Sequence, residues 1–117
     1  MSPTLIVGVP HDQALDEMFG PVATVHTFSD DDEAVALAND APFGLAGYVF
    51  SKDEERAWSV ARRMETGMVK INGVTMLALN PDAPRPAWKQ SGLGHEGARD
   101  TIEFFLGDTV VGVAARP

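Results

Sequence analysis

The chain has 117 residues, the size of one ordinary domain, and we expect residues 1–117 to form a single domain. Hydrophobic residues make up 44% of the sequence and charged residues 22%, as is typical of a soluble globular protein. The formal net charge is -8, and an acidic surface repels phosphate backbones, so nucleic acid is not an expected partner. Since no apolar run could span a bilayer and Leu5–Val9 is too short for a signal peptide, we expect a cytoplasmic protein without a membrane partner.

The N-terminal region is predicted to contain two strands and a short helix. Residues 3–9 are apolar and indicate a buried strand. Residues 22–28 alternate and are rich in β-branched side chains, which indicates a second strand. Ser29 and Asp32 fit a capping box, so we expect a helix over residues 34–38 that ends at the following asparagine.

The middle of the chain is predicted to form a strand, a helix and another strand. Residues 45–50 are apolar and indicate a buried strand, after which Ser51 and Glu54 fit a second capping box. Gly67 is placed as the glycine that ends the helix, and residues 68–72 indicate the next strand. The apolar face of this helix is predicted to consist of Ala57, Val60, Ala61 and Met64.

The C-terminal third begins with a long proline-containing segment, residues 73–94. A loop of this length in a small domain is usually functional or unanchored. A third helix is expected over residues 96–106, closed by Gly107, and a final strand over residues 109–113. The apolar stripe of that helix is predicted to be Ile102, Phe105 and Leu106. The resulting order, β-β-α-β-α-β-loop-α-β, predicts an α/β protein with a layered, at least partly parallel sheet and flanking helices.

Four segments of the chain, in order, are similar to motifs of one enzyme family. They are Asp16–Val22 (compare E-E-I-F-G-P-V), Glu33–Asn39 with Pro42–Ala46 (A-x-x-x-A-N-x-x-x-Y-G-L-A), Glu65–Asn72 (E-x-G-x-V-x-V-N) and Lys89–Gly97 (K-x-S-G-x-G-R-E-G). On these residues the chain resembles the C-terminal part of the catalytic domain of the aldehyde dehydrogenase superfamily. It departs from the family pattern at Pro84–Ala87, where the family usually has P-F-G-G, and at His95, where the family has arginine.

The resemblance implies a reaction and the protein domain and catalytic residues that the reaction needs. Family members oxidise aldehydes to carboxylic acids with NAD or NADP, using a Rossmann-like domain, a catalytic cysteine and a glutamate general base that precede the segment found in this chain. The chain has no cysteine and no G-x-G-x-x-G motif between a strand and a helix. We therefore assign no catalytic residue and expect the chain alone not to catalyse the family reaction.

Glu17 and Phe19 are the cofactor-binding residues that the resemblance implies. The matching glutamate accepts hydrogen bonds from the nicotinamide-side ribose, and the matching aromatic packs near the same sugar. One hydrogen bond to a charged group contributes about 1.5–3 kcal/mol, whereas millimolar affinity already needs about 4 kcal/mol net. These two side chains are expected to bind the cofactor only together with the missing domain. The alternative is that the segment has no cofactor role and is an acidic loop followed by a buried phenylalanine.

Other polar residues give weaker indications. The three histidines lack ligand spacing, so no metal site is expected. Ser91 is not in a G-x-S-x-G elbow, and Asn72 at a strand end indicates a turn or a bond to the backbone. Trp58 and Trp88 are interpreted as packing residues.

Two kinds of function stay open on the sequence. The chain is either part of an aldehyde dehydrogenase, active when joined to a separate N-terminal portion, or a non-catalytic binding and assembly module that keeps the family fold. A complete small enzyme of another class is the least favoured reading. Because an unpaired strand edge promotes pairing with another copy, a homo-oligomer formed through residues 109–113, through Pro81–Pro86 or through both is expected, with a monomer as the alternative.

Overall fold

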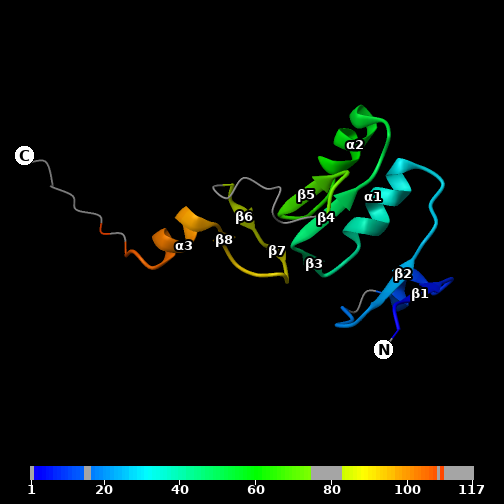
Figure 1. Cartoon of the computed structure of the whole chain (residues 1–117), viewed down its shortest axis with the longest axis horizontal. Coiled ribbons are helices and arrows are strands. Elements are labelled where there is room, and N and C mark those ends of the chain that lie inside the picture. The colour runs from blue at the N-terminus through cyan, green and yellow to red at the C-terminus, as the bar shows by residue number, and fades with distance from the viewer. Residues whose placement is uncertain (1, 15–16, 75–82, 108, 110–117) are drawn as a thin grey trace, which may run out of the picture.

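The computed structural model describes residues 2–14, 17–74, 83–107 and 109. In this part of the chain the strands form four separate pairs, accompanied by three α-helices and a 3-10 turn. Within the described residues, the first strand pair and the last helix lie at opposite ends (Figure 1). None of the described helices is long and apolar enough to cross a membrane.

The N-terminal unit is a parallel pair of strands. β1 (Thr4–Val7) pairs with β2 (Val22–Val25), so that Leu5 is opposite Ala23. The 3-10 turn η1 (His11–Gln13) lies in the connection between the two strands. Both strands were expected from the sequence. The burial predicted for the first strand is wrong, however, because Leu5 is 71% exposed.

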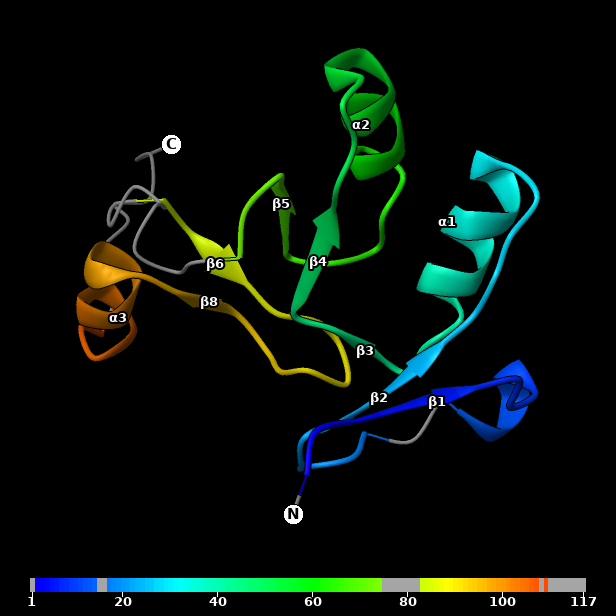
Figure 2. The ribbon, with the colours of Figure 1, turned by 45° about the vertical axis from the view of Figure 1, so that its right-hand side comes forward.

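The central unit is a β-α-β arrangement. β4 (Ala46–Val49) runs parallel to β5 (Met68–Ile71), and α2 (Glu54–Ala61) connects them and packs against both. α1 (Asp31–Asn39) precedes this unit and lies beside it (Figures 1 and 2). In the described part of the chain, the buried apolar side chains are Val35, Ala57 and Ala61.

Two short antiparallel pairs complete the described structure. β3 (Phe43–Gly44) pairs with β7 (Trp88–Lys89), and β6 (Arg85–Pro86) pairs with β8 (His95–Glu96). α3 (Ala98–Phe104) follows at the end away from β1 and β2 (Figure 2). The sequence prediction missed all four of these two-residue strands, because such short elements carry no periodic pattern and form only when distant segments meet.

The predicted capping boxes are each wrong by one or two residues. Asp30 caps α1, with Oδ1 accepting from the Glu33 amide at 2.9 Å, and Asp53 caps α2 in the same way. The two serines have other roles. Ser29 donates from its amide and its hydroxyl to the Glu33 carboxylate at 2.7 Å, and Ser51 accepts from the Asp53 amide at 3.1 Å. Aspartate, and not serine, is the N-cap of both helices because it directly precedes the first helical residue in each case.

The role predicted for Gly67 is also wrong. α2 ends at Ala61 with Arg62 as its C-cap, five residues before the glycine. Gly67 instead lies against β6, where an added Cβ would be 1.5 Å from the Pro86 carbonyl oxygen. The glycine is needed for close approach of two backbones, a constraint that the local sequence does not reveal.

The fold class, an α/β arrangement with parallel strand pairs and flanking helices, is confirmed. The helix predicted over residues 96–106 is the shorter α3, and its predicted apolar stripe is exposed, with Ile102 at 62% and Phe105 at 79%. Residues 75–82 of the predicted loop and almost all of the predicted strand 109–113 lie outside the described residues. Trp58 and Trp88, interpreted as packing residues, are about half exposed.

Candidate functional site

The four segments that carry the family resemblance surround one cavity of about 450 Å³. Glu17 lines it from the first segment, Ala38 and Leu45 from the second, Thr66 from the third, and Ser91 from the fourth. These residues are up to 74 positions apart in the sequence. The fold therefore brings the motifs together beside the C-terminal end of α1 and the strand β3.

A polar cluster at the end of α1 joins three of the four segments. The Lys89 ammonium donates to the carbonyls of Asn39 at 2.5 Å and Ala41 at 3.2 Å, and forms an ion pair with Glu65 at 3.0 Å. The Asn39 side chain donates to the Arg63 carbonyl at 2.9 Å and accepts from the Glu65 amide at 2.8 Å. The cluster satisfies carbonyls that the helix end leaves without intrahelical partners. Its members are supporting residues that fix the cavity walls.

Ser91 has a structural role in the same wall. Its Oγ accepts a hydrogen bond from the Gly44 amide at 2.9 Å, while the Gln90 amide donates to the Pro42 carbonyl at 2.9 Å. These contacts attach the segment that follows β7 to the segment around β3. The hydroxyl of Ser91 thus helps to fix the backbone around β3.

The two residues predicted to contact a cofactor differ in their surroundings. Glu17 is an exposed residue at the edge of the cavity, so its carboxylate is available to a ligand there. Phe19 is 95% exposed, so the described residues of this chain do not bury it. Their roles toward a cofactor stay predictions.

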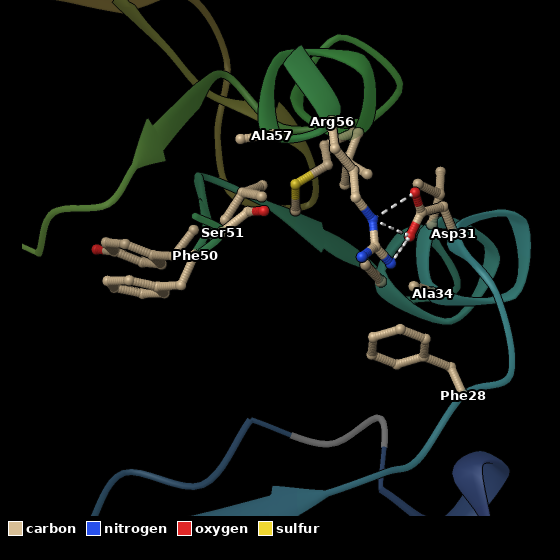
Figure 3. Close-up of a pocket in the computed structure, with 13 residues that line it drawn as sticks. Phe28, Asp31, Ala34, Phe50, Ser51, Arg56 and Ala57 are labelled. Carbon is tan, nitrogen blue, oxygen red and sulfur yellow. Dashed lines mark hydrogen bonds and ion pairs between the residues drawn. The ribbon is translucent and has the colours of Figure 1, made fainter. Parts of the chain in front are cut away.

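A second cavity, of about 350 Å³, lies between α1, α2 and the end of β4 (Figure 3). On its wall Arg56 of α2 points toward Asp31 of α1 and binds both carboxylate oxygens at 2.6–3.1 Å. These hydrogen bonds from the guanidinium hold the pKa of the Asp31 carboxyl below its ordinary value, and the same contact raises the pKa of Arg56. Phe28 and Phe50 also line this cavity, which is otherwise largely apolar. Since the cation is already paired, this cavity offers no free charge to a ligand.

Asn72 confirms the backbone-bonding role predicted for it. Its side chain accepts from the Ser51 amide and donates to the Ser51 carbonyl, both at 2.9 Å. The residue has a positive φ of 52°, which asparagine tolerates better than most residues. The asparagine thus continues the pairing of β4 and β5 beyond their last residues.

Sequence reasoning missed several contacts between distant residues. The rings of His11 and His26 lie edge to face at 5.3 Å, although their spacing in sequence gives no sign of it. Lys70, on β5, is only 6% exposed, and its ammonium lies 5.0 Å from the centre of the Tyr48 ring. Within the described residues no group of three histidine, aspartate or glutamate side chains is placed to hold a metal ion. The K-x-S-G motif drew attention to Lys89, but it gave no indication that this side chain binds the end of α1 and Glu65.

Comparison with known proteins agrees with this geometry. The sequence profile of the aldehyde dehydrogenase family matches residues 1–111. The "Putative aldehyde dehydrogenase" of Staphylococcus haemolyticus is 44% identical over 106 residues, and a Staphylococcus aureus homologue with the same description is 45% identical. Each match covers 89% of this chain. The chain belongs to the aldehyde dehydrogenase family.

Solved structures show the same relationship. Betaine aldehyde dehydrogenase of Staphylococcus aureus in complex with NAD+ superposes on 88% of this chain with a TM-score of 0.80 and 40% identity. Another NAD+ complex of that enzyme covers 97% of this chain, with a TM-score of 0.81 and 35% identity. The chain spans only 22% of the length of the sequence relatives and 20–24% of these two structures. It is thus similar to one portion of a much longer enzyme.

Proposed function

We propose that this chain acts as the C-terminal part of an aldehyde dehydrogenase catalytic domain and does not oxidise aldehydes unless the N-terminal part is supplied. The observation that carries the proposal is the coverage: 89% of the chain matches 22% of a relative. The sequence has no cysteine to form the thiohemiacetal that the family reaction requires. The reaction proposed for the joined protein is oxidation of an aldehyde to a carboxylic acid.

The exposed surface supports the need for a missing portion. Large apolar side chains are exposed at both ends of the molecule, including Val7 at 71% and Phe104 at 81%. Apolar surface on this scale is usually covered by another polypeptide. The remainder of the catalytic domain is the cover that the family relationship favours.

The proposed part of the chain in cofactor binding is one wall of the nicotinamide-side site. The carboxylate of Glu17 offers two oxygens, which suits two adjacent ribose hydroxyls. The cavity beside it, about 450 Å³, is within the size range of small-molecule sites. The similar betaine aldehyde dehydrogenase binds NAD+, so we favour NAD as the cofactor of the joined protein. Phe19, which is 95% exposed, is proposed to pack on the same sugar.

The alternative function is a non-catalytic assembly module. The exposed apolar residues of α3 favour it, because they would also serve contacts with a second copy of this chain. We propose that the partner in either case is a protein, since the acidic surface disfavours nucleic acid. The two functions differ in one testable respect. Only a part of the enzyme would restore activity to an N-terminal catalytic portion from which the C-terminal segment has been removed.

The test is complementation. The full chain would be mixed with a version of the staphylococcal relative that ends before the matched segment, and NADH formation would be followed with a panel of aldehydes. We expect activity from the mixture and none from either component alone. Aldehyde oxidation by this chain alone would refute the proposal. A stable complex without activity would favour the assembly module.

A further inference from the structure

The cavity beside Glu17 has a second polar residue on its wall whose side chain is available to a ligand. The residues with polar side chains in its lining are Glu17, Thr66, Gln90 and Ser91. The Thr66 hydroxyl donates to the Met68 carbonyl at 2.9 Å, and the Ser91 hydroxyl accepts from the Gly44 amide at 2.9 Å. Glu17 and Gln90 are exposed, and the described part of the chain offers their side chains no hydrogen-bond partner.

The backbone that presents Gln90 to the cavity is fixed. The preceding residue, Lys89, has a φ of 53°, in the left-handed region that residues with a side chain rarely adopt. Its ammonium donates to the carbonyl of Ala41, which lines the same cavity, at 3.2 Å. The Gln90 amide itself donates to the Pro42 carbonyl at 2.9 Å. Such backbone conformations persist only where contacts over-determine them, and they cluster at ligand sites.

The two available side chains complement each other chemically. A carboxylate only accepts hydrogen bonds, whereas the side-chain amide of a glutamine carries two N–H donors. When a ligand hydroxyl donates to Glu17, its own oxygen keeps lone pairs, and Gln90 supplies donors for them. The lining contains no lysine or arginine, so it does not suit a phosphate or a carboxylate. A neutral vicinal diol, with two hydrogens to donate and two oxygens to accept, matches this acceptor and donor pair.

We propose that Gln90 is a specificity-determining residue of this site, which donates to the oxygens of a vicinal diol while Glu17 accepts the hydrogens of that diol. Lys89 is a positioning residue that holds the turn before Gln90. The identity of the diol as the ribose of NAD rests on the proposed function, whereas the diol as the class of ligand rests on the cavity. Gln90→Glu would replace the donor by an acceptor and would place a second carboxylate at the site, so it should be at least as harmful as Gln90→Ala.

The first test uses the full chain and needs no activity. Gln13 and Gln90 are the two glutamines of the sequence, so Gln90→Ala and Gln13→Ala assign their side-chain amide signals in a nitrogen-15 NMR spectrum. The probe is nicotinamide riboside, at up to about 50 mM because a few hydrogen bonds give weak binding. The control probe is its 2′,3′-dideoxy analogue, which lacks the diol. We expect the riboside alone to shift the Gln90 signals, with Gln13 unaffected, and Glu17→Gln to reduce this shift by roughly threefold or more.

The second test uses the active complex of this chain with the N-terminal portion of the relative. Gln90→Ala should raise the KM for NAD by about fivefold with kcat unchanged, as expected for one neutral hydrogen bond. Gln13→Ala is the matched control and should leave the KM unchanged. The double variant Glu17→Ala/Gln90→Ala should raise the KM by less than the product of the single effects, because both side chains contact the same diol.

Gln90 signals that do not shift, or that shift equally with the dideoxy analogue, would overturn the proposal. An active complex in which Gln90→Ala leaves the KM for NAD unchanged would overturn it as well, and would leave the proposed function standing. An inactive mixture together with a diol-dependent shift of the Gln90 signals would refute the proposed function and support Gln90 as a diol contact.

Discussion

Replacement of Gly67 by alanine tests the close approach between two backbones that defines the central part of the fold. The new Cβ would lie 1.5 Å from the Pro86 carbonyl oxygen and 2.6 Å from its carbonyl carbon. Ordinary contact begins at 3.4 Å, so β6 would have to retreat by about 2 Å. Movement of the glycine itself would instead strain the hydrogen bond that its amide donates to the Gly44 carbonyl at 2.9 Å. We expect a loss of about 3 kcal/mol in the free energy of unfolding, the upper end of the range for overpacking.

Gly73→Ala is the matched control, since among the described residues its Cβ would meet only the Ile71 carbonyl oxygen, at 3.8 Å. Urea unfolding of both variants, followed by tryptophan fluorescence, measures the difference directly. The fluorescence of Trp88 is well placed for this purpose, because β7 follows β6 by one residue. Equal stability of the two variants, within about 0.5 kcal/mol, would refute the reasoning, as that is the scatter of surface substitutions.

Three further substitutions test local contacts. Asn72→Ala should lower the free energy of unfolding in urea by about 2 kcal/mol, because it removes two hydrogen bonds to the Ser51 backbone. Asn72→Gly tolerates the positive φ of this position and should lower it by no more than that. Asp30→Ala should cost about 1 kcal/mol by removing the N-cap of α1, and unchanged stability would contradict that role. Arg56→Gln should destabilise the chain at pH 7 but not at pH 2. The reason is that Asp31 has a lowered pKa, so its contribution is present above its unfolded pKa and is lost as the pH falls through the folded value. An equal effect at both pH values in acid titrations followed by circular dichroism would exclude this ion pair as the cause.

Apolar runs and periodic patterns predicted the longer elements, because both are carried by neighbouring residues of one segment. The strands around Ile6, Tyr48 and Val69, and the helices that contain Val35 and Ala57, were all expected from local sequence. The helix starts were misplaced because serine and aspartate both accept hydrogen bonds from backbone amides, and only the three-dimensional structure shows which of them caps. Local patterns could not predict the two-residue strands, since these depend on pairing between segments that are distant in the sequence.

Of the cavity-lining residues, the sequence singled out Glu17 as a cofactor contact, and that role stays a prediction. The motif resemblance pointed to Glu17, and the fold places motif residues from all four segments around one cavity. It gave no indication that Lys89 would bind the end of α1, nor that His11 would approach Asp40. Such contacts join residues 29 to 50 positions apart. Side-chain chemistry permits many partners at that separation, and only the fold selects one.

A chimera tests the central claim most directly. Residues 1–111 of this chain would replace the matched segment of the staphylococcal relative, and NADH formation would be measured against aldehyde and NAD concentration. We predict an active chimera in which Glu17→Ala raises the KM for NAD by about tenfold, as expected for losing one charge-assisted hydrogen bond of about 1.5 kcal/mol. A folded chimera without activity, or one in which Glu17→Ala leaves the KM for NAD unchanged, would contradict the account.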